Sequence, residues 1–175
     1  TPTALLRSLV GSEMCIRDRL AVEPDIWFLD EPFSALDPLI RKEMQDEFLR
    51  LQSMLQKTIV FITHDFGIVA RMCDRVAVMY AGRIVEQADV RDLFNKPHHP
   101  YTQALMDSVP KMDRTDRLRA IDGQPPPLWD LPEGCRFASR CSNVKDLCRN
   151  EYPNTSLLDN NHSVACWMTQ TEWNN

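Results

Sequence analysis

The sequence predicts an α/β fold followed by a small cysteine-rich tail, and three observations support this. Residues 26–30 (IWFLD) and 58–63 (TIVFIT) are short apolar runs of the kind that forms buried strands. Between them, residues 38–56 carry apolar side chains at helical intervals of three and four. The order strand, helix, strand is typical of a βαβ unit with a parallel sheet. Finally, four of the six cysteines crowd into the last quarter of the chain.

Local signals mark the ends of these and later elements. Asp37 suits the N-cap of the long helix, and Pro38 suits its first turn. Downstream, a short helix over 67–73 precedes a hairpin that turns at Gly82, and the stretch ADVRDLF predicts another short helix. Proline-rich stretches then indicate an extended linker, and the cysteine-bearing segment lies beyond it.

Composition and charge narrow the classes of function. The chain has 175 residues, 43% hydrophobic and 26% charged, with a net charge of −5. A negative chain does not favour a nucleic-acid partner. No apolar run approaches the roughly 20 residues that span a bilayer, and the N-terminus lacks the features of a secretory signal. The cysteines are therefore expected to be reduced or metal-bound rather than disulfide-bonded.

The first apolar strand ends in two neighbouring carboxylates, Asp30 and Glu31. Ligands of α/β sheets bind beyond the carboxyl ends of the strands. One carboxylate there can hold Mg²⁺ while the next polarises an attacking water. Alone the pattern is weak, because many apolar runs end in an acidic pair that only begins a solvated turn.

Three motifs in order carry a resemblance to a known family. They are IWFLDE, then SALD within DEPFSALDP, then THD after the second strand. Over residues 20–110 the chain resembles the ATPase subunits of ABC transporters, in which these are the Walker B motif, the D-loop and the switch histidine. The resemblance implies part of a RecA-like P-loop NTPase lobe, with a parallel sheet and flanking helices, that uses ATP and Mg²⁺.

The resemblance also implies a role for each motif residue. Asp30 would serve Mg²⁺, and Glu31 would act as the general base. His64 would contact the γ-phosphate and the attacking water; the alternative is a histidine that caps a strand end. The D-loop residues would cross the dimer interface towards the other subunit's site. They are Ser34, Ala35, Leu36 and Asp37.

Two motifs of the family are absent from this sequence. The five glycines nowhere show the spacing of a phosphate-binding loop, G-x-x-x-x-G-K-[ST]. At the position of the LSGGQ signature, residues 6–10 read LRSLV. Residues 1–19 are atypical, and their stretch SLVGSEMCIRDR resembles translated sequencing-adapter sequence, which makes the segment a candidate artefact. We expect the chain alone to have no ATPase activity, because the triphosphate is gripped mainly by the missing loop.

The later sequence is similar to one branch of the family. Over residues 67–168, RVAVMYAGRIVEQ, NKPHHPYTQALMDSVP, GCRFASRC and HSVAC resemble the dipeptide and oligopeptide importer ATPases. Residues 20–65 are instead similar to the glycine betaine and proline importer ATPases. The resemblance to the peptide importers has more weight, because the ATPases of the quaternary-amine group end in a different regulatory domain. The expected function is therefore to power the import of di- or oligopeptides, with quaternary-amine import as the alternative.

Four thiols within about thirty residues, in a segment with little core of its own, predict a metal site. They are Cys135, Cys141, Cys148 and Cys166. Their spacing lacks the C-x-x-C pairs of zinc ribbons, and the resemblance implies a [4Fe–4S] cluster. Zn²⁺ is one alternative, with His162 as a competing ligand, and four buried thiols without a metal are the other.

The resemblance also implies an organisation, partners and a location. The expected parts are an atypical segment at 1–19, an ATPase part at 20–110, a proline-rich linker at 111–134 and a cysteine region at 135–168. A second ABC ATPase subunit and transmembrane permease subunits would be the partners, with the chain peripheral on the cytoplasmic face of the membrane. Two rivals stay open. One is a soluble ABC ATPase of DNA repair or translation, a class that lacks the HPYTQAL stretch, and the other is a non-catalytic metal-binding or interaction fragment.

Overall fold

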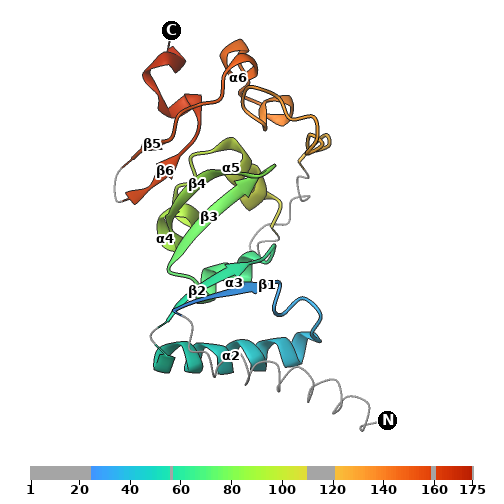
Figure 1. Cartoon of the computed structure of the whole chain (residues 1–175), viewed down its shortest axis with the longest axis vertical. Helices are drawn as coiled ribbons and strands as arrows, with labels where there is room; N and C mark the ends of the chain where they lie inside the picture. Colours follow the sequence, from blue (N-terminus) through green and yellow to red (C-terminus); the bar gives the residue numbers. More distant parts are fainter. Residues whose placement is uncertain (1–24, 56, 110–120, 159–160, 175) are drawn as a thin grey trace. The chain divides into compact units, whose positions relative to one another are not determined.

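The computed structural model describes residues 25–55, 57–109, 121–158 and 161–174 (Figure 1). The chain divides into two compact units, 1–64 and 65–175. The atypical segment 1–19, including Cys15, and the first part of the expected linker, 111–120, lie outside the described residues. Both units combine helices with strands, so the mixed character of the fold is confirmed.

The N-terminal unit is a βαβ arrangement, as its sequence predicts. Strand β1 (Ile26–Asp30) is followed by helix α2 (Pro38–Leu55) and strand β2 (Thr58–Ile62). The two strands pair in parallel, from Ile26 opposite Thr58 to Asp30 opposite Ile62. Because parallel strands point the same way, the chain leaves both of them at the same edge of the sheet.

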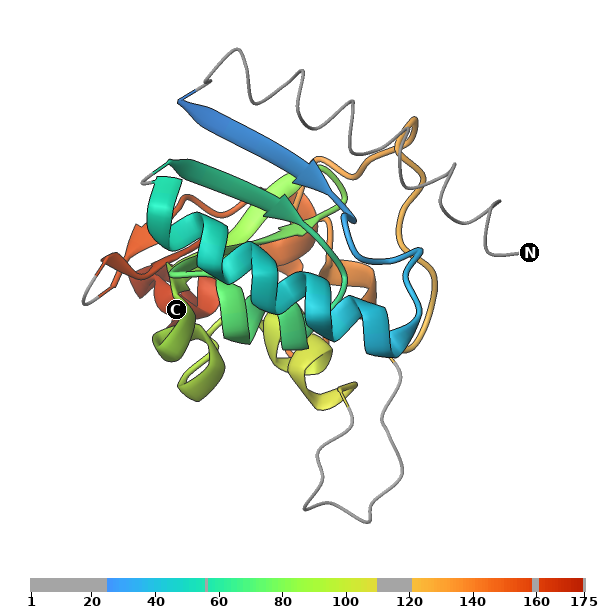
Figure 2. The same ribbon diagram turned by 90° about the horizontal axis from the view of Figure 1, so that it is seen from below.

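Aromatic packing holds α2 against one face of this strand pair (Figure 2). The rings of Phe48 on the helix and Phe61 on β2 lie 5.1 Å apart between centroids, in an edge-to-face arrangement. Phe33, from the loop between β1 and α2, is buried and lies 6.2 Å from both rings. These contacts fix the loop that carries the D-loop motif, because aromatic pairs at this spacing are favourable beyond the apolar area they bury.

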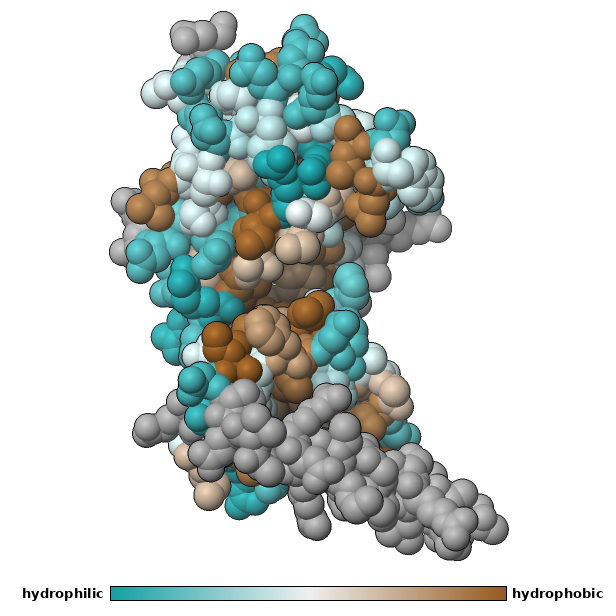
Figure 3. All heavy atoms as spheres, viewed as in Figure 1, coloured by the Kyte–Doolittle hydropathy of each residue, from teal (hydrophilic) through white to brown (hydrophobic). Residues whose placement is uncertain are grey.

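The other face of the strand pair is apolar and exposed. Its side chains alternate with the packed ones, as the pleat of a strand requires. Apolar side chains gather over this region of the surface in Figure 3. The exposed residues on this face are Ile26, Phe28, Val60 and Ile62.

The C-terminal unit is built around the predicted hairpin. Strand β3 (Arg75–Tyr80) follows helix α3 (Phe66–Met72) and pairs antiparallel with β4 (Arg83–Asp89). The two turn residues, Ala81 and Gly82, both have positive φ, at 45° and 83°. Such a turn matches the right-handed twist of the strands, and Gly82 adopts it without a steric cost.

The tail of the chain completes this second sheet. Its strand order is β3-β4-β6-β5, in which β5 (Ser156–Leu157) and β6 (Ser163–Val164) come from the tail. All of its pairs are antiparallel, so among the described residues parallel pairing is confined to β1 and β2. The tail therefore packs as part of the C-terminal unit rather than beside it.

Short helices surround this sheet. They are α4 (Val90–Asn95), α5 (Pro100–Asp107), α6 (Asp146–Asn150) and the 3₁₀ turns η1 (Ala138–Arg140), η3 (Trp167–Thr169) and η4 (Thr171–Asn174). The core combines residues of the sheet with Leu93 of α4, Met106 of α5 and Phe137 of the cysteine segment. No helix within the described ranges has the length and the apolar character needed to cross a membrane.

Candidate functional site

The acidic pair lies at the edge where β1 and β2 both end. Glu31 is the first residue after β1, and Thr63 and His64 are the first two after β2. The backbone N–H of Glu31 donates to the carbonyl of Ile62 over 2.8 Å, which extends the parallel ladder by one bond. The predicted acid and histidine motifs are thus brought together by strand pairing.

The Glu31 carboxylate is held by the end of the neighbouring strand. Its Oε1 accepts from the backbone N–H of His64 over 2.8 Å, and its Oε2 accepts from the Thr63 hydroxyl over 3.3 Å. Its own backbone has a φ of 43°, a conformation that costs a non-glycine residue of the order of 1–3 kcal/mol. The Ser34 hydroxyl binds the Glu31 carbonyl over 2.9 Å and supports this turn.

Asp30 and His64 differ from Glu31 in their surroundings. Both side chains are exposed, whereas Glu31 is half-buried. His64 contacts Glu31 through its backbone, so its imidazole is not the group that binds the carboxylate. The edge of the sheet therefore offers one restrained carboxylate beside an exposed carboxylate and an exposed imidazole.

The D-loop residues form the turn that leads into α2. Asp37 caps the helix, because its Oδ1 accepts from the backbone N–H of Leu39 over 2.9 Å. Arg41, one turn into the helix, donates from Nη2 to the carbonyls of Leu36 over 3.1 Å and Ser34 over 3.4 Å. These contacts fix the loop while the side chains of Ser34, Ala35 and Asp37 remain exposed.

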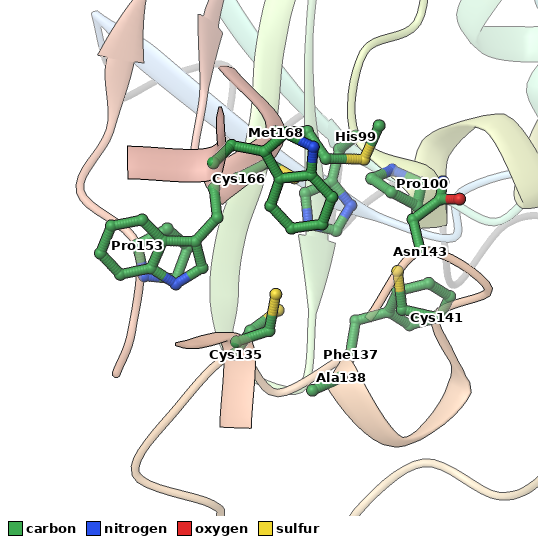
Figure 4. Close-up of a pocket in the computed structure, with 13 residues that line it drawn as sticks. His99, Pro100, Cys135, Phe137, Ala138, Cys141, Asn143, Pro153, Cys166 and Met168 are labelled. Atoms are coloured by element: carbon green, nitrogen blue, oxygen red, sulfur yellow. The ribbon is translucent and has the colours of Figure 1, made fainter. Parts of the chain in front are cut away.

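The four clustered cysteines line a single pocket in the C-terminal unit. Figure 4 shows Cys135 and Cys141 from the cysteine segment and Cys166 from the tail around it, with His99 and Pro100. Cys148, at the centre of α6, also lines it. The clustering that the sequence predicts is therefore present, and the described cysteines form no disulfide.

Burial raises the pKa of three thiols of this pocket, those of Cys135, Cys141 and Cys166. Burial raises the pKa of Cys166 to about 12, with a further rise from the other three cysteines. The pKa values of Cys135 and Cys141 are also raised, mainly by burial and secondly by neighbouring cysteines. A metal that binds here must displace these protons, so its affinity should increase with pH.

The side chains that line the pocket are not arranged as the ligands of a metal ion, in the part of the chain that the structure describes. Within the described ranges, no group of three or more His, Cys, Asp or Glu side chains is placed to hold a metal ion. His162 is not among the residues that line the pocket, and its Nε2 lies 2.7 Å from the buried carboxylate of Glu86. Four thiols fit a [4Fe–4S] cluster in kind and number, whereas His162 is engaged elsewhere and does not fit as a zinc ligand.

Comparison with known proteins shows what the chain is similar to. Residues 85–148 match the family model of the oligopeptide/dipeptide transporter C-terminal region. The dipeptide transport ATP-binding protein DppD of Bacillus subtilis is 43% identical over 150 residues, which are 85% of this chain and 45% of DppD. Over most of its length the chain is similar to peptide-transport ATP-binding proteins.

Other peptide-transport relatives agree. The probable peptide ABC transporter ATP-binding protein y4tR of Sinorhizobium fredii is 46% identical over 152 residues, 86% of this chain and 45% of that protein. The oligopeptide transport ATP-binding protein AppD of Bacillus subtilis is 40% identical over 154 residues, 87% of this chain and 47% of that protein. The chain thus spans a little under half the length of these relatives, and the quaternary-amine alternative is not favoured.

A solved structure also matches part of the chain. It is cbiO1 from Clostridium perfringens, part of the ABC transporter complex cbiONQ, with 38% identity over 44% of this chain and 31% of that one. The TM-score of 0.40 is too low to establish the fold.

Sequence reasoning did not identify Thr63, Arg41 or Glu86. Arg41 had a usable signal, because a cation in the first turn of a helix opposes the helix dipole and indicates a specific contact. Thr63 and Glu86 had none, since each acts on groups that are distant in the sequence.

Proposed function

We propose that this chain is part of the ATP-hydrolysing subunit of a peptide importer, and that it supplies the magnesium, general-base and switch residues of the ATP site. The observation that carries the proposal is the position of Glu31 where two parallel strands end, bound by Thr63 and His64 of the neighbouring strand. The similarity to peptide-transport ATP-binding proteins supports it. The proposed lobe is RecA-like, and the proposed substrates are di- and oligopeptides.

Each residue of the edge has a proposed task. ATP with Mg²⁺ supplies the phosphoryl chemistry when bound. Asp30, exposed at the end of β1, would hold the metal, and Glu31 Oε1 would take a proton from the attacking water. A carboxylate oxygen has a second acceptor site, so Glu31 Oε1 can bind the water while it keeps the N–H of His64. The exposed His64 imidazole would contact the γ-phosphate.

The D-loop has a proposed task between subunits. The segment from Ser34 to Asp37 is fixed at its base by Arg41, and its side chains are largely exposed. A rigid, exposed turn suits contact with a second ATPase subunit. Transmembrane permease subunits would be the further partners, and the location would be the cytoplasmic face of the membrane.

A chimera tests the ATPase proposal. The segment of Bacillus subtilis DppD that matches this chain would be replaced by the corresponding residues of this chain, and ATP hydrolysis and dipeptide uptake would be measured. Glu31→Gln should lower hydrolysis by roughly 10²–10⁴-fold, the usual contribution of a general base. Glu47→Gln is the matched control, because Glu47 lies exposed on α2 in an ion pair with Arg50. An active chimera that Glu31→Gln leaves unchanged would contradict the assignment.

The cysteine pocket has a separate proposed occupant, a [4Fe–4S] cluster. The support is that four thiols from three segments line one pocket. Anaerobic purification, an iron and zinc assay and a visible absorption spectrum distinguish the cluster from zinc and from a metal-free pocket. A colourless protein without iron would exclude the cluster.

A further inference from the structure

A buried carboxylate joins two segments that are far apart in the sequence. Glu86, on β4, is 1% exposed. Its Oε1 accepts from the backbone N–H of His98 over 2.7 Å, and its Oε2 accepts from that of His99 over 3.0 Å. The Nε2 of His162 lies 2.7 Å from the same Oε1. We call Glu86, His98, His99 and His162 the Glu86 clasp.

The hydrogen-bond donors of the clasp match the acceptors of a carboxylate. When Glu86 is ionised it only accepts hydrogen bonds, and the His162 tautomer with its proton on Nε2 then donates to it. Three N–H groups then satisfy a charge that would otherwise be costly to bury. One side chain therefore holds the turn that begins α5 and the tail segment that precedes β6.

Those two segments continue directly into the cysteine pocket. His99 and Pro100 of the turn line the pocket, and so do Cys166 and Trp167, which follow β6 (Figure 4). Strand β6 pairs with β4 at two positions, Val164 opposite Glu86 and Ser163 opposite Gln87, and the backbone N–H of Ala165 donates to the Val85 carbonyl over 2.9 Å. Such a short pairing gives little hold on the tail unless side chains add to it.

The cysteine segment, which forms the third wall of the pocket, is held by contacts that do not involve Glu86. Cys135 donates from its backbone to the Cys148 carbonyl over 2.8 Å. Arg136 binds the Ala81 carbonyl, and Arg140 binds the Tyr80 hydroxyl over 3.1 Å. These contacts fix the cysteine segment to the hairpin without Glu86, so loss of the clasp should release two walls and leave the third in place.

We propose that Glu86 is a positioning residue that closes the turn and the tail around the four cysteines and so keeps their thiols enclosed in one pocket. It touches none of the thiols and acts through the backbone of His98 and His99 and the ring of His162. The inference rests on the metal-binding role proposed for the pocket, but the enclosure of the thiols can be tested without any metal.

The experiment compares variants of the 175-residue chain. In Glu86→Gln the amide nitrogen must face one of the N–H donors, so at least one contact of the clasp is lost. Asp89→Asn is the matched control, because it removes an exposed carboxylate from the same strand, at 55% side-chain exposure in its ion pair with Arg75. His162→Gln keeps an N–H donor for Glu86, whereas His162→Leu removes it.

Two readouts follow the pocket. The first is the rate at which a thiol reagent modifies Cys148 and Cys166 in the metal-free protein, which should increase roughly tenfold in Glu86→Gln and His162→Leu as local opening becomes easier. The second is the thiolate-to-cobalt absorption in an anaerobic Co²⁺ titration, where affinity should fall by about 10–100-fold in the same variants. Asp89→Asn should have the thiol reactivity and Co²⁺ affinity of the unchanged chain. Both quantities in His162→Gln should lie between those of the unchanged chain and those of His162→Leu.

The outcomes separate the two proposals. Folded Glu86→Gln protein with unchanged thiol reactivity overturns the role of Glu86. If Glu86→Gln does not fold, the two His162 variants decide, and equal reactivity in both overturns it. If the unchanged chain binds no Co²⁺, the metal-binding role fails, whereas slow thiol modification that depends on the clasp still supports the positioning role.

Discussion

At the scale of single residues, Gly134 leaves no room for a side chain. A Cβ there would overlap the carbonyl oxygens of Arg149 and Cys148, and both are backbone atoms. Gly134→Ala should therefore lower the free energy of unfolding by about 1–3 kcal/mol, the usual cost of overpacking. Urea denaturation followed by tryptophan fluorescence measures this. Glu133→Ala, at the exposed neighbouring residue, should change the free energy of unfolding little. Equal stability of the two variants would show that the backbone moves to accommodate the added Cβ.

His99 should make stability depend on pH. Burial lowers its pKa from 6.5 to about 4, although Glu86 acts in the opposite direction. Its Nδ1 accepts from the backbone N–H of Tyr101 over 3.0 Å, a bond that protonation abolishes. The unfolded chain binds a proton below pH 6.5 and the folded chain only near pH 4, so stability is full above 6.5 and falls as the pH falls towards 4. The loss should total about 3 kcal/mol.

The variant His99→Asn tests this origin of the pH dependence. Asparagine keeps an acceptor for the N-cap bond but does not titrate. Unfolding free energies at pH 7 and pH 4.5–5 should differ less in the variant than in the unchanged chain. The same pH dependence in both would mean that another group is responsible.

Single residues also mark how far sequence reasoning reaches. The positions of Asp30, Glu31 and His64 could be predicted because each lies at or within two residues of the end of a strand, and strand ends have a local pattern. Glu86 could not, since it binds residues 12 and 76 positions away and its own surroundings in the sequence, RIVEQ, look like an ordinary strand. The role of Thr63 likewise depends on a partner 32 residues earlier.

At the scale of elements, α2 has a cap that also belongs to the D-loop. Asp37→Ala removes the acceptor for the Leu39 N–H and should lower the stability of the helix by about 1 kcal/mol. Asp37→Asn keeps an acceptor, so its stability should lie within a few tenths of a kcal/mol of the stability of the unchanged chain. Urea denaturation followed by far-ultraviolet circular dichroism compares them. Equal losses would show that the charge of Asp37, not its hydrogen bond, stabilises the helix.

The long elements and the short helices α3 and α4 could be predicted, whereas the two-residue strands of the tail could not. Strands β1 and β2, helix α2 and the hairpin β3–β4 have enough residues for a periodic pattern or a turn signal to appear. The tail strands β5 and β6 have two residues each, so they carry no periodicity and form only because β4 offers them an edge. Helix α5 had a signal, Pro100 in its first turn after the capping His99, but the sequence analysis did not predict it.

At the scale of the whole molecule, the exposed apolar face of β1 and β2 should limit solubility. Phe28 is 71% exposed, and an apolar face of this kind promotes association. Phe28→Thr should raise the concentration at which the protein precipitates, with little change in stability, because threonine suits a strand. Phe61→Thr is the contrasting variant, since Phe61 packs against Phe48 and Phe33. It should instead lower stability by about 3 kcal/mol, and precipitation of Phe28→Thr at an unchanged concentration would exclude this face as the cause.

The division of the chain was the least predictable feature at this scale. Composition placed boundaries near the proline-rich stretches, where the character of the sequence changes. The structure divides the chain between His64 and Asp65, where no change in composition occurs. The reason is that long-range pairing decides compactness: the tail joins β4 through β6, so the cysteine region and the hairpin form one unit.

The two sheets should also assemble at different speeds. Tyr80 pairs with Arg83 across the hairpin turn, whereas β1 and β2 join positions 32 residues apart, as Glu31 and Thr63 are. Contacts between neighbours in sequence close within microseconds, while distant contacts must first overcome the entropy of a long loop. We therefore expect the hairpin to be an early folding nucleus and the Glu31 edge to form late, so that a refolding chain gains its β3–β4 hairpin before its acidic motif has a strand to bind.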